Sequence, residues 1–229
     1  MSRYAALIPI KDHSERVPGK NFRPLEGRPL WQHVVATLHA VERIGRIYIN
    51  TDSARFTAEA LAPFPRVTII PRPAVLCGDF VPTNHLFAHD LTQVPAYVQS
   101  FVQTHTTNPL LTVSTVERAL DAFEAAQAAG TADSLFTVTP HFARFYRRDL
   151  SAVNHDPAVL LRTQDLDPLL EENSNLYIFS RESFAATGAR IGRRPVLFEM
   201  DRLEATDIDD PPTWALAEAL LRQRSAPAP

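Results

Sequence analysis

Apolar runs of strand length alternate with segments of helical spacing along most of the 229-residue chain. Residues 4–10 form the first apolar run, and residues 29–42 carry apolar side chains at helical spacing behind a proline. We expect further strands at residues 46–52, 66–70, 97–103 and 133–139, and further helices at residues 53–62 (with Ser53 as a possible N-cap) and 115–130. Such alternation predicts an α/β fold whose mostly parallel sheet has helices on both faces.

The alternation breaks after residue 139. Residues 141–150 and 158–166 look extended, with no long helix between them. Strand-like runs then return at residues 175–180 and 194–200, and a last helix is expected at residues 211–224. We therefore predict a single domain over residues 1–229, with an arm or insertion at about residues 140–172.

Composition narrows the class of protein. The net charge of −3 argues against general binding to nucleic acid or to a membrane surface. Cys77 is the single cysteine, so no internal disulfide framework exists and a reducing compartment is expected. No apolar run is long enough to span a bilayer, and no signal-peptide pattern is present. These features predict a cytoplasmic protein.

A cluster of cations directly follows the first predicted strand. Lys11, Arg16 and Lys20 lie within ten positions of a mildly acidic chain. In open α/β sheets ligands bind outside the carboxyl ends of the strands, and cations there suit phosphate groups. The segment contains neither G-x-G-x-x-G nor G-x-x-x-x-G-K-[ST], so it is not a dinucleotide loop or a P-loop. A solvated basic loop remains the alternative.

The segment "TDIDDPP", residues 206–212, supplies a possible acidic counterpart. If it is extended, Asp207 and Asp209 point to one face and Ile208 points into the core. Two adjacent carboxylates repel unless a cation joins them, and such a pair suffices for Mg²⁺ that keeps water and substrate phosphates as its other ligands. Asp210 before Pro211 reads as a helix N-cap. The alternative is that all three acids serve turns and caps.

Several motifs together resemble the acylneuraminate cytidylyltransferases, the CMP-sialic acid synthetase family. They are "IPIKDHSERVPGKNFRPLEGRPL", "INTDS", "RPAVLCGD", "RTQDLDPLLEENSNLYIFSRE" and "EMDRLEATDIDDPPTWALAEALL", which together extend over most of the chain. The resemblance implies a Rossmann-like nucleotidyltransferase fold with a β-rich dimerisation arm. It also implies CTP and a sialic-acid-like 2-keto-3-deoxy sugar acid as substrates, Mg²⁺ or Mn²⁺ as cofactor, and a homodimer.

The resemblance assigns roles to residues of this sequence. Lys11, Arg16 and Lys20 would hold the triphosphate, Ser14 and Asn21 would add hydrogen bonds, and Arg72 would help to place the cytosine. The metal would bind Asp207 and Asp209, and the residues expected to carry the chemistry are Lys11, Arg16, Lys20 and Asp209. Residues expected on the sugar side are His105, Thr106, Arg162, Gln164, Asp165 and Asn173, of which Arg162 is a candidate partner for the sugar carboxylate. Ion pairs at a dimer interface are the alternative for the residues of the arm.

The sequence departs from the family pattern at a few positions. Lys11 and Glu15 stand where the family usually has Arg and Lys, and His105 takes the place of a usual Gln. His105 would either bind substrate as a neutral imidazole or act as a base near neutral pH, and a hydrogen-bonded structural histidine is the alternative; a binding role is favoured. The segment 173–175, "NSN", replaces a usual "NGA". Two other functions stay open: a metal-dependent nucleotide-sugar glycosyltransferase and a non-catalytic nucleotide-binding relative.

Overall fold

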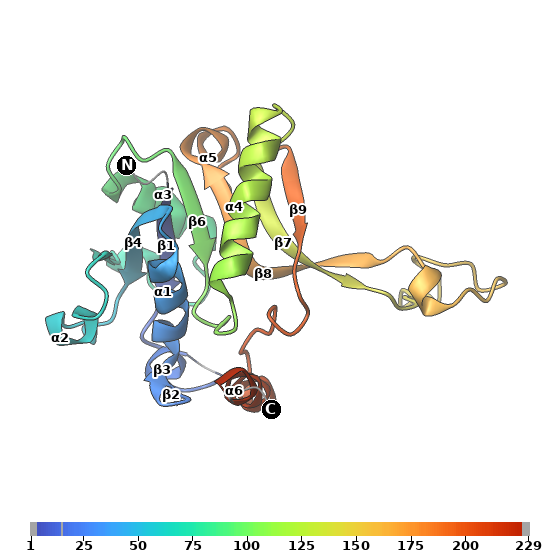
Figure 1. Cartoon of the computed structure of the whole chain (residues 1–229), viewed down its shortest axis with the longest axis horizontal. Coiled ribbons are helices and arrows are strands. Elements are labelled where there is room, and N and C mark those ends of the chain that lie inside the picture. Colours follow the sequence, from blue (N-terminus) through green and yellow to red (C-terminus); the bar gives the residue numbers. More distant parts are fainter. Residues whose placement is uncertain (1–3, 15, 226–229) are drawn as a thin grey trace.

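A seven-stranded sheet forms the centre of the computed structural model, which describes residues 4–14 and 16–225 (Figure 1). The strands lie in the order β5-β4-β1-β6-β8-β7-β9. Their bounds are β1 Tyr4–Ile10, β4 Ile44–Thr51, β5 Val67–Pro71, β6 Ser100–Thr104, β7 Ser134–His141, β8 Leu169–Ser180 and β9 Pro195–Glu199. Strand β8 runs antiparallel to β6 and β7, and the other pairings are parallel. The prediction of a mostly parallel sheet is therefore confirmed.

Helices cover both faces of this sheet because its strands alternate their side chains. On β1, Ala6 and Ile8 pack in one buried cluster with side chains of α1 and α4. Ala5 and Leu7 pack in a second cluster with side chains of α3 and α5. The helices are α1 Leu30–Ala40, α2 Ala58–Leu61, α3 Thr83–Gln93, α4 Val113–Ala128, α5 Arg181–Thr187 and α6 Pro211–Ser225. The period of two along β1 thus divides the core into two layers.

The short helix expected at residues 53–62 begins later than predicted. It is α2, whose N-cap is Thr57 rather than Ser53. The Ser53 hydroxyl instead donates to Asp12 Oδ1 at 2.7 Å. The cap prediction is wrong because Ser53 is used to join the turns that follow β1 and β4.

The last helix and the segment before it pack against residues that follow β1. Ile208 and Trp214 are buried in a third cluster with Val17 and Leu25. Leu25 belongs to a small antiparallel ribbon, β2 (Pro24–Leu25) and β3 (Arg28–Pro29), that follows the basic loop. This packing holds the segment before α6 against the loop after β1, although about 190 residues separate them in the chain.

An antiparallel ribbon carries the chain away from the body of the protein (Figure 1). Strands β7 and β8 remain paired from Val138 opposite Glu172 to His141 opposite Leu169. Residues 142–168 connect them and contain one 3₁₀ turn, η3 Thr163–Asp165. At the base of the ribbon, Ser174 has φ +53°, a conformation that only a small fraction of non-glycine residues adopt. This is the position at which the related motif carries glycine.

Within residues 4–14 and 16–225, no helix combines the length and the apolar character needed to cross a bilayer.

Candidate active site

The loop after β1 is fixed in place by a buried asparagine. Asn21 is 6% exposed, donates to the carbonyl of Lys11 at 2.8 Å and accepts from Thr106 Oγ1 at 2.6 Å. Gly19 precedes it with φ +65°, a backbone conformation that glycine adopts without steric cost. Asn21 therefore ties the basic loop to the loop after β6, and both loops line one cavity.

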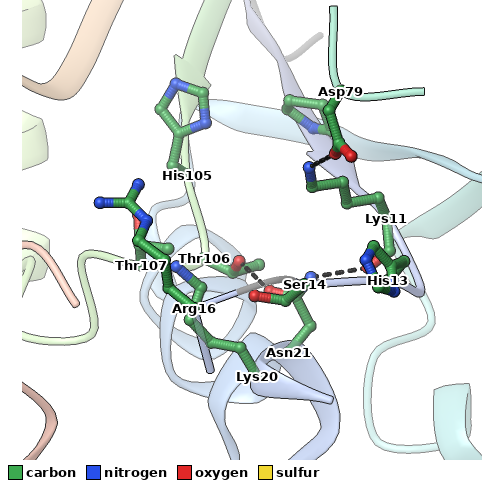
Figure 2. A pocket seen from close by; sticks show the side chains of 11 residues that line it. Lys11, His13, Ser14, Arg16, Lys20, Asn21, Asp79, His105, Thr106 and Thr107 are labelled. Carbon is green, nitrogen blue, oxygen red and sulfur yellow. Dashed lines mark hydrogen bonds and ion pairs between the residues drawn. The ribbon is translucent and has the colours of Figure 1, made fainter. Parts of the chain in front are cut away.

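This first cavity has a volume of about 270 Å³ and lies at the carboxyl edge of the sheet. Figure 2 shows its lining side chains arranged around an open centre. The lining residues are Pro9, Lys11, His13, Ser14, Arg16, Lys20, Asn21, Asp79, His105, Thr106 and Thr107. The structure thus brings the predicted phosphate-binding side chains of the loop together with His105 and Thr106.

Each cation of the cavity is paired with a carboxylate in the absence of ligand. Arg16 Nη2 lies 3.0 Å from Asp209 Oδ1, and Lys20 Nζ lies 3.8 Å from the same oxygen. Lys11 Nζ lies 2.5 Å from Asp79 Oδ1. Burial lowers the pKa of Lys20, while the charge of Asp209 opposes that shift. Among the residues that the structure describes, Asp209 and Asp79 form ion pairs with these three cations, and the charge of Asp207 also acts on Lys20.

The segment 207–209 has the alternation expected of an extended chain. Ile208 is fully buried, its N–H donates to the carbonyl of Thr107 at 2.8 Å, and its carbonyl accepts from Lys20 Nζ at 2.7 Å. Burial raises the pKa of Asp207, a hydrogen bond with Thr107 opposes that shift, and the nearby charge of Asp209 adds to the rise. The carboxylates are thus held beside the basic loop by the backbone between them.

The donor set suits a hard divalent cation. Asp207 Oδ1 is buried and has no hydrogen-bond partner among the residues that the structure describes. A buried carboxylate oxygen without a donor is unfavourable unless it binds a cation or a proton. No cluster of three or more His, Cys, Asp or Glu side chains with metal-binding geometry occurs in the described ranges, so water and substrate phosphates would supply the remaining ligands.

The third acid of the segment has a different task. Asp210 Oδ1 accepts from the N–H of Thr213 at 2.8 Å, and this bond lowers the pKa of Asp210. The Thr213 hydroxyl accepts in return from the N–H of Asp210 at 3.1 Å. Asp210 therefore caps α6, and that part of the sequence prediction is confirmed.

His105 is held as a neutral imidazole. Burial is the main cause that lowers its pKa to about 3, and the charges of Arg190 and Lys20 lower it further. Its Nε2 lies 3.2 Å from both Gln103 Nε2 and Arg190 Nη1. Two donors at Nε2 and a lowered pKa both make the ring a poor acceptor of protons near neutral pH, and this favours binding over base catalysis.

A second cavity, of about 370 Å³, lies at the base of the arm. Its lining residues are Thr139, His141, Glu171, Glu172, Asn173, Ser174, Arg202, Ala205 and Asp207. The amide of Asn173 is occupied, because its Oδ1 accepts from Thr137 Oγ1 at 2.6 Å and its Nδ2 donates to Thr139 Oγ1 at 3.0 Å. Asn173 therefore shapes the wall of this cavity. Asp207 lines this second cavity and is hydrogen-bonded to Thr107, which lines the first.

Arg72 lies outside the lining of both cavities. Its Nε donates to Asn50 Oδ1 at 2.7 Å, and its Nη2 donates to the carbonyls of Asn50 and Ile10 at 2.9 and 3.3 Å. These bonds join the ends of β1 and β4, from which the loops of the first cavity begin. The cytosine role of Arg72 stays a prediction.

The arm residues predicted for the sugar side lie apart from both cavities within one chain. Arg162 forms a bidentate pair with Asp165, with Nε and Nη2 at 2.6 and 2.9 Å from the carboxylate oxygens. Gln164 belongs to the same 3₁₀ turn, η3. Their predicted contact with substrate therefore depends on a second copy of the chain.

Some lining residues were not singled out from the sequence. Asp79 lies within "RPAVLCGD", and its place one residue before an exposed aromatic gave no sign of an ion pair with Lys11. Arg202 lines the second cavity, whereas Arg190 lines neither cavity and contacts His105. Both have other arginines nearby in the sequence, so no spacing marks either of them. Their roles follow from tertiary packing, which the sequence pattern does not encode.

Comparison with known proteins gives consistent matches. The family model described as "Cytidylyltransferase" matches residues 5–207. The CMP-N,N'-diacetyllegionaminic acid synthase of Legionella pneumophila is 24% identical over 96% of this chain and 96% of its own. The 3-deoxy-manno-octulosonate cytidylyltransferase of an Anaeromyxobacter species is 37% identical over 27% of this chain and 25% of its own.

Two solved structures share the fold. A CMP:2-keto-3-deoxy-manno-octonic acid synthetase complexed with CTP matches with a TM-score of 0.68 at 16% identity, over 97% of this chain and all of that chain. A 4-diphosphocytidyl-2C-methyl-D-erythritol synthase matches with a TM-score of 0.66 at 15% identity, over 96% of this chain and all of that chain. At these low sequence identities the two structures show a shared fold and nothing further.

Proposed function

This chain belongs to the cytidylyltransferase family, and from that premise we propose that it transfers CMP from CTP to a sialic-acid-like 2-keto-3-deoxy sugar acid. The observation that carries the proposal is the first cavity, where Lys11, Arg16 and Lys20 converge beside Asp209. Three cations suit the triphosphate of CTP. The sugar class is supported by the full-length relative, whose name specifies a CMP-N,N'-diacetyllegionaminic acid synthase.

The reaction requires positioning and neutralisation of charge. The anomeric hydroxyl oxygen of the sugar acid attacks the α-phosphorus of CTP, the bond to the oxygen that bridges to the β-phosphate breaks, and pyrophosphate leaves with the electron pair. The hydroxyl proton passes to solvent. Lys20 and Arg16 neutralise charge that develops on the departing pyrophosphate, and such fixed charges lower the barrier without covalent catalysis.

We propose Mg²⁺ or Mn²⁺ as the cofactor, held by Asp207 and Asp209. When bound, such a cation neutralises phosphate charge and polarises the phosphoryl oxygens. Occupation of the pair would release Asp209 from Arg16 and Lys20, and both cations would then be available to the phosphates. The hydrogen bonds of the Ile208 backbone to Thr107 and Lys20 hold the segment that carries the two carboxylates against the loops of the first cavity.

The alternatives raised by the sequence are less well supported. A nucleotide-sugar glycosyltransferase does not follow from membership of the cytidylyltransferase family. A non-catalytic relative would have no need to keep two neighbouring carboxylates next to the three cations of the first cavity. The proposed enzyme explains both features.

Pyrophosphate release tests the proposed function. The chain is incubated with Mg²⁺, a panel of eight- and nine-carbon ulosonic acids, and each of CTP, UTP, ATP and GTP. We expect release with CTP and at least one acid. The proposal would be contradicted if CTP gave no pyrophosphate release with any of the acids, or if all four nucleotides gave equal release.

We also propose that the arm joins two copies of the chain. A two-stranded ribbon is only marginally stable in water by itself. The segment 142–168 that connects its strands carries strongly exposed apolar side chains, among them Leu150 at 83% and Leu160 at 88%. In a homodimer these side chains would be covered. Arg162, Gln164 and Asp165 would then be free to approach the cavities of the partner chain.

The double variant Leu150→Asp with Leu160→Asp is expected to be monomeric, because buried unpaired carboxylates oppose association. Sedimentation equilibrium should give a mass near the 25.6 kDa of one chain, against twice that value for the unmodified protein. Leu216→Asp, a change at a half-exposed leucine of α6, is the matched control and should leave the mass doubled. A monomeric unmodified protein would refute the dimer.

A further inference from the structure

A buried arginine links the two cavities. The Arg190 side chain is 16% exposed and lies over the ring of Tyr177, with Cζ 3.6 Å from the centroid. Its Nη1 faces His105, which lines the first cavity, and its Nη2 lies 3.9 Å from Glu172 Oε1, which belongs to the lining of the second. Glu172 also accepts a hydrogen bond from the Tyr177 hydroxyl. Arg190 is therefore enclosed by partners on three sides.

The carboxylate of Asp133 fixes the backbone that directly follows Arg190. Asp133 accepts from the N–H groups of Arg193 and Arg194 at 2.9 and 3.0 Å, and these bonds lower its pKa. Gly192 lies directly over this carboxylate, since a Cβ there would be 2.2 Å from Asp133 Oδ1. The loop between α5 and β9 thus has one closely defined path, and Arg190 is held in place before any ligand arrives.

Gln103 has a determined amide orientation because of Arg190. Its Oε1 accepts from Arg190 Nη1 at 2.7 Å, and its Nε2 donates to the carbonyl of Thr104 at 2.9 Å. The reverse orientation would place the amide nitrogen against the guanidinium and the oxygen against a carbonyl. The Gln103 nitrogen, a donor, therefore faces His105 Nε2 at 3.2 Å.

Two donors converge on one nitrogen of His105. Arg190 Nη1 and Gln103 Nε2 both lie 3.2 Å from His105 Nε2, and neither has a lone pair to offer. His105 Nε2 must accept, so the single proton of the neutral ring resides on Nδ1. Figure 2 shows the other ring nitrogen turned toward the side of the first cavity where Lys11 lies.

We propose that Arg190 and Gln103 are positioning residues that fix His105 as its Nδ1–H tautomer, and that this N–H donates to a carboxylate or carbonyl oxygen of the sugar acid. The assignment to the sugar rests on the proposed function. It is favoured because His105 is joined through Arg190 to Glu172 of the second cavity. Of the three cations that suit the phosphates, Arg16 and Lys20 pair with Asp209 and Lys11 pairs with Asp79, and none of them is bonded to His105 within the part of the chain that the structure describes.

The arrangement selects for an acceptor on the substrate. A substrate group that can only donate would find no lone pair on Nδ1–H, whereas the oxygen of a carboxylate or an acyl carbonyl can accept this hydrogen bond. Burial is the main cause that keeps His105 from gaining a second proton, and the positive charges of Arg190 and Lys20 add to it. The bond from Arg190 to Nε2 also strengthens the remaining N–H as a donor. Arg190 thus acts through His105 and needs no contact with the substrate itself.

Nitrogen-15 NMR of the histidine rings in the full chain tests the tautomer without any assay of activity. We expect Nδ1 of His105 to be protonated and Nε2 to be unprotonated throughout pH 5–8. Arg190→Met should allow His105 to titrate closer to the ordinary histidine pKa, and Arg190→Lys should restore the wild-type ring signals at least in part. A proton on Nε2 of the unmodified protein would overturn the proposal.

Steady-state kinetics test the substrate contact. Loss of one hydrogen bond to an anionic oxygen predicts that Arg190→Met and His105→Leu raise KM for the sugar acid by about tenfold, with KM for CTP unchanged. His105→Gln keeps an N–H donor and should stay within about threefold of the unmodified protein. A rise in KM for CTP alone would overturn the assignment to the sugar. If no acid is turned over, the proposed function fails while the NMR result still decides the positioning role.

Discussion

Asp209→Asn is expected to abolish metal-dependent turnover, with kcat reduced by about 10³-fold or more. Asp209 is the carboxylate on which Arg16 and Lys20 converge, and it neighbours Asp207, whose buried oxygen lacks a donor. Asparagine keeps the shape of the side chain but removes the charge that a divalent cation needs. The Asp209 side chain is 42% exposed, so we expect the melting temperature to change little. Pyrophosphate release across a Mg²⁺ titration measures the effect.

Asp210→Asn is the matched control for this variant. It removes the same charge one residue further along, and Asn is as good an N-cap as Asp, so α6 should stay capped. We expect nearly unchanged turnover and an unchanged melting temperature. Survival of activity in Asp209→Asn, or equal losses in the two variants, would show that the carboxylate pair does not hold the metal.

Lys20→Met is expected to lower kcat/KM for CTP by about 10²- to 10³-fold, a loss typical of removing one fixed charge from a transition-state site. The Lys20 side chain is 12% exposed, and its ammonium donates to the carbonyl of Ile208 at 2.7 Å. Methionine fills the space of the aliphatic stem but supplies neither the charge nor this bond. A modest fall in melting temperature should accompany the kinetic loss, because the Ile208 carbonyl loses its partner.

Arg23→Met is the control for Lys20→Met. Arg23 follows the same basic loop but lies over the ring of Trp214, with Cζ 4.6 Å from the centroid, and it does not line the first cavity. We expect its kcat/KM for CTP to stay within about threefold, because an exposed charge outside the cavity is screened by solvent. Equal losses in both variants would indicate general attraction of CTP by positive charge rather than a specific contact.

The fold could be predicted from the sequence wherever buried side chains recur at a regular spacing along the chain. Residues 4–10 alternate between two buried clusters, and this alternation fixes the strand and both helical layers. The direction of β8 was not predictable, because apolar residues bury a strand equally well in either direction. The observed antiparallel direction follows from the ribbon, since β8 returns along β7 from the arm.

The site was predictable where neighbouring residues in the chain share a role. The basic loop and the segment 207–209 each lie in one short stretch, and the structure brings them together at Asp209. Arg72 and Arg190, by contrast, cannot be told apart from the sequence, although the structure places them in different surroundings. Arg72, which a motif singled out, binds strand ends, whereas Arg190, outside the quoted motifs, reaches His105. Only tertiary packing decides between them.

Two departures from the family pattern have different outcomes. Lys11, at the position of a usual arginine, lines the first cavity and pairs with Asp79. Glu15 lies outside the described residues, so its effect on activity stays a prediction. A cytoplasmic location likewise stays a prediction.

Phosphorus-31 NMR of the reaction products tests the central claim most directly. The chain is mixed with CTP, Mg²⁺ and the ulosonic acid that gives the fastest pyrophosphate release. The proposed chemistry predicts one new phosphodiester resonance, from CMP joined to the sugar, in equal amount to pyrophosphate. Free CMP or CDP with inorganic phosphate, and no phosphodiester, would show that the enzyme hydrolyses CTP and would contradict the proposed transfer.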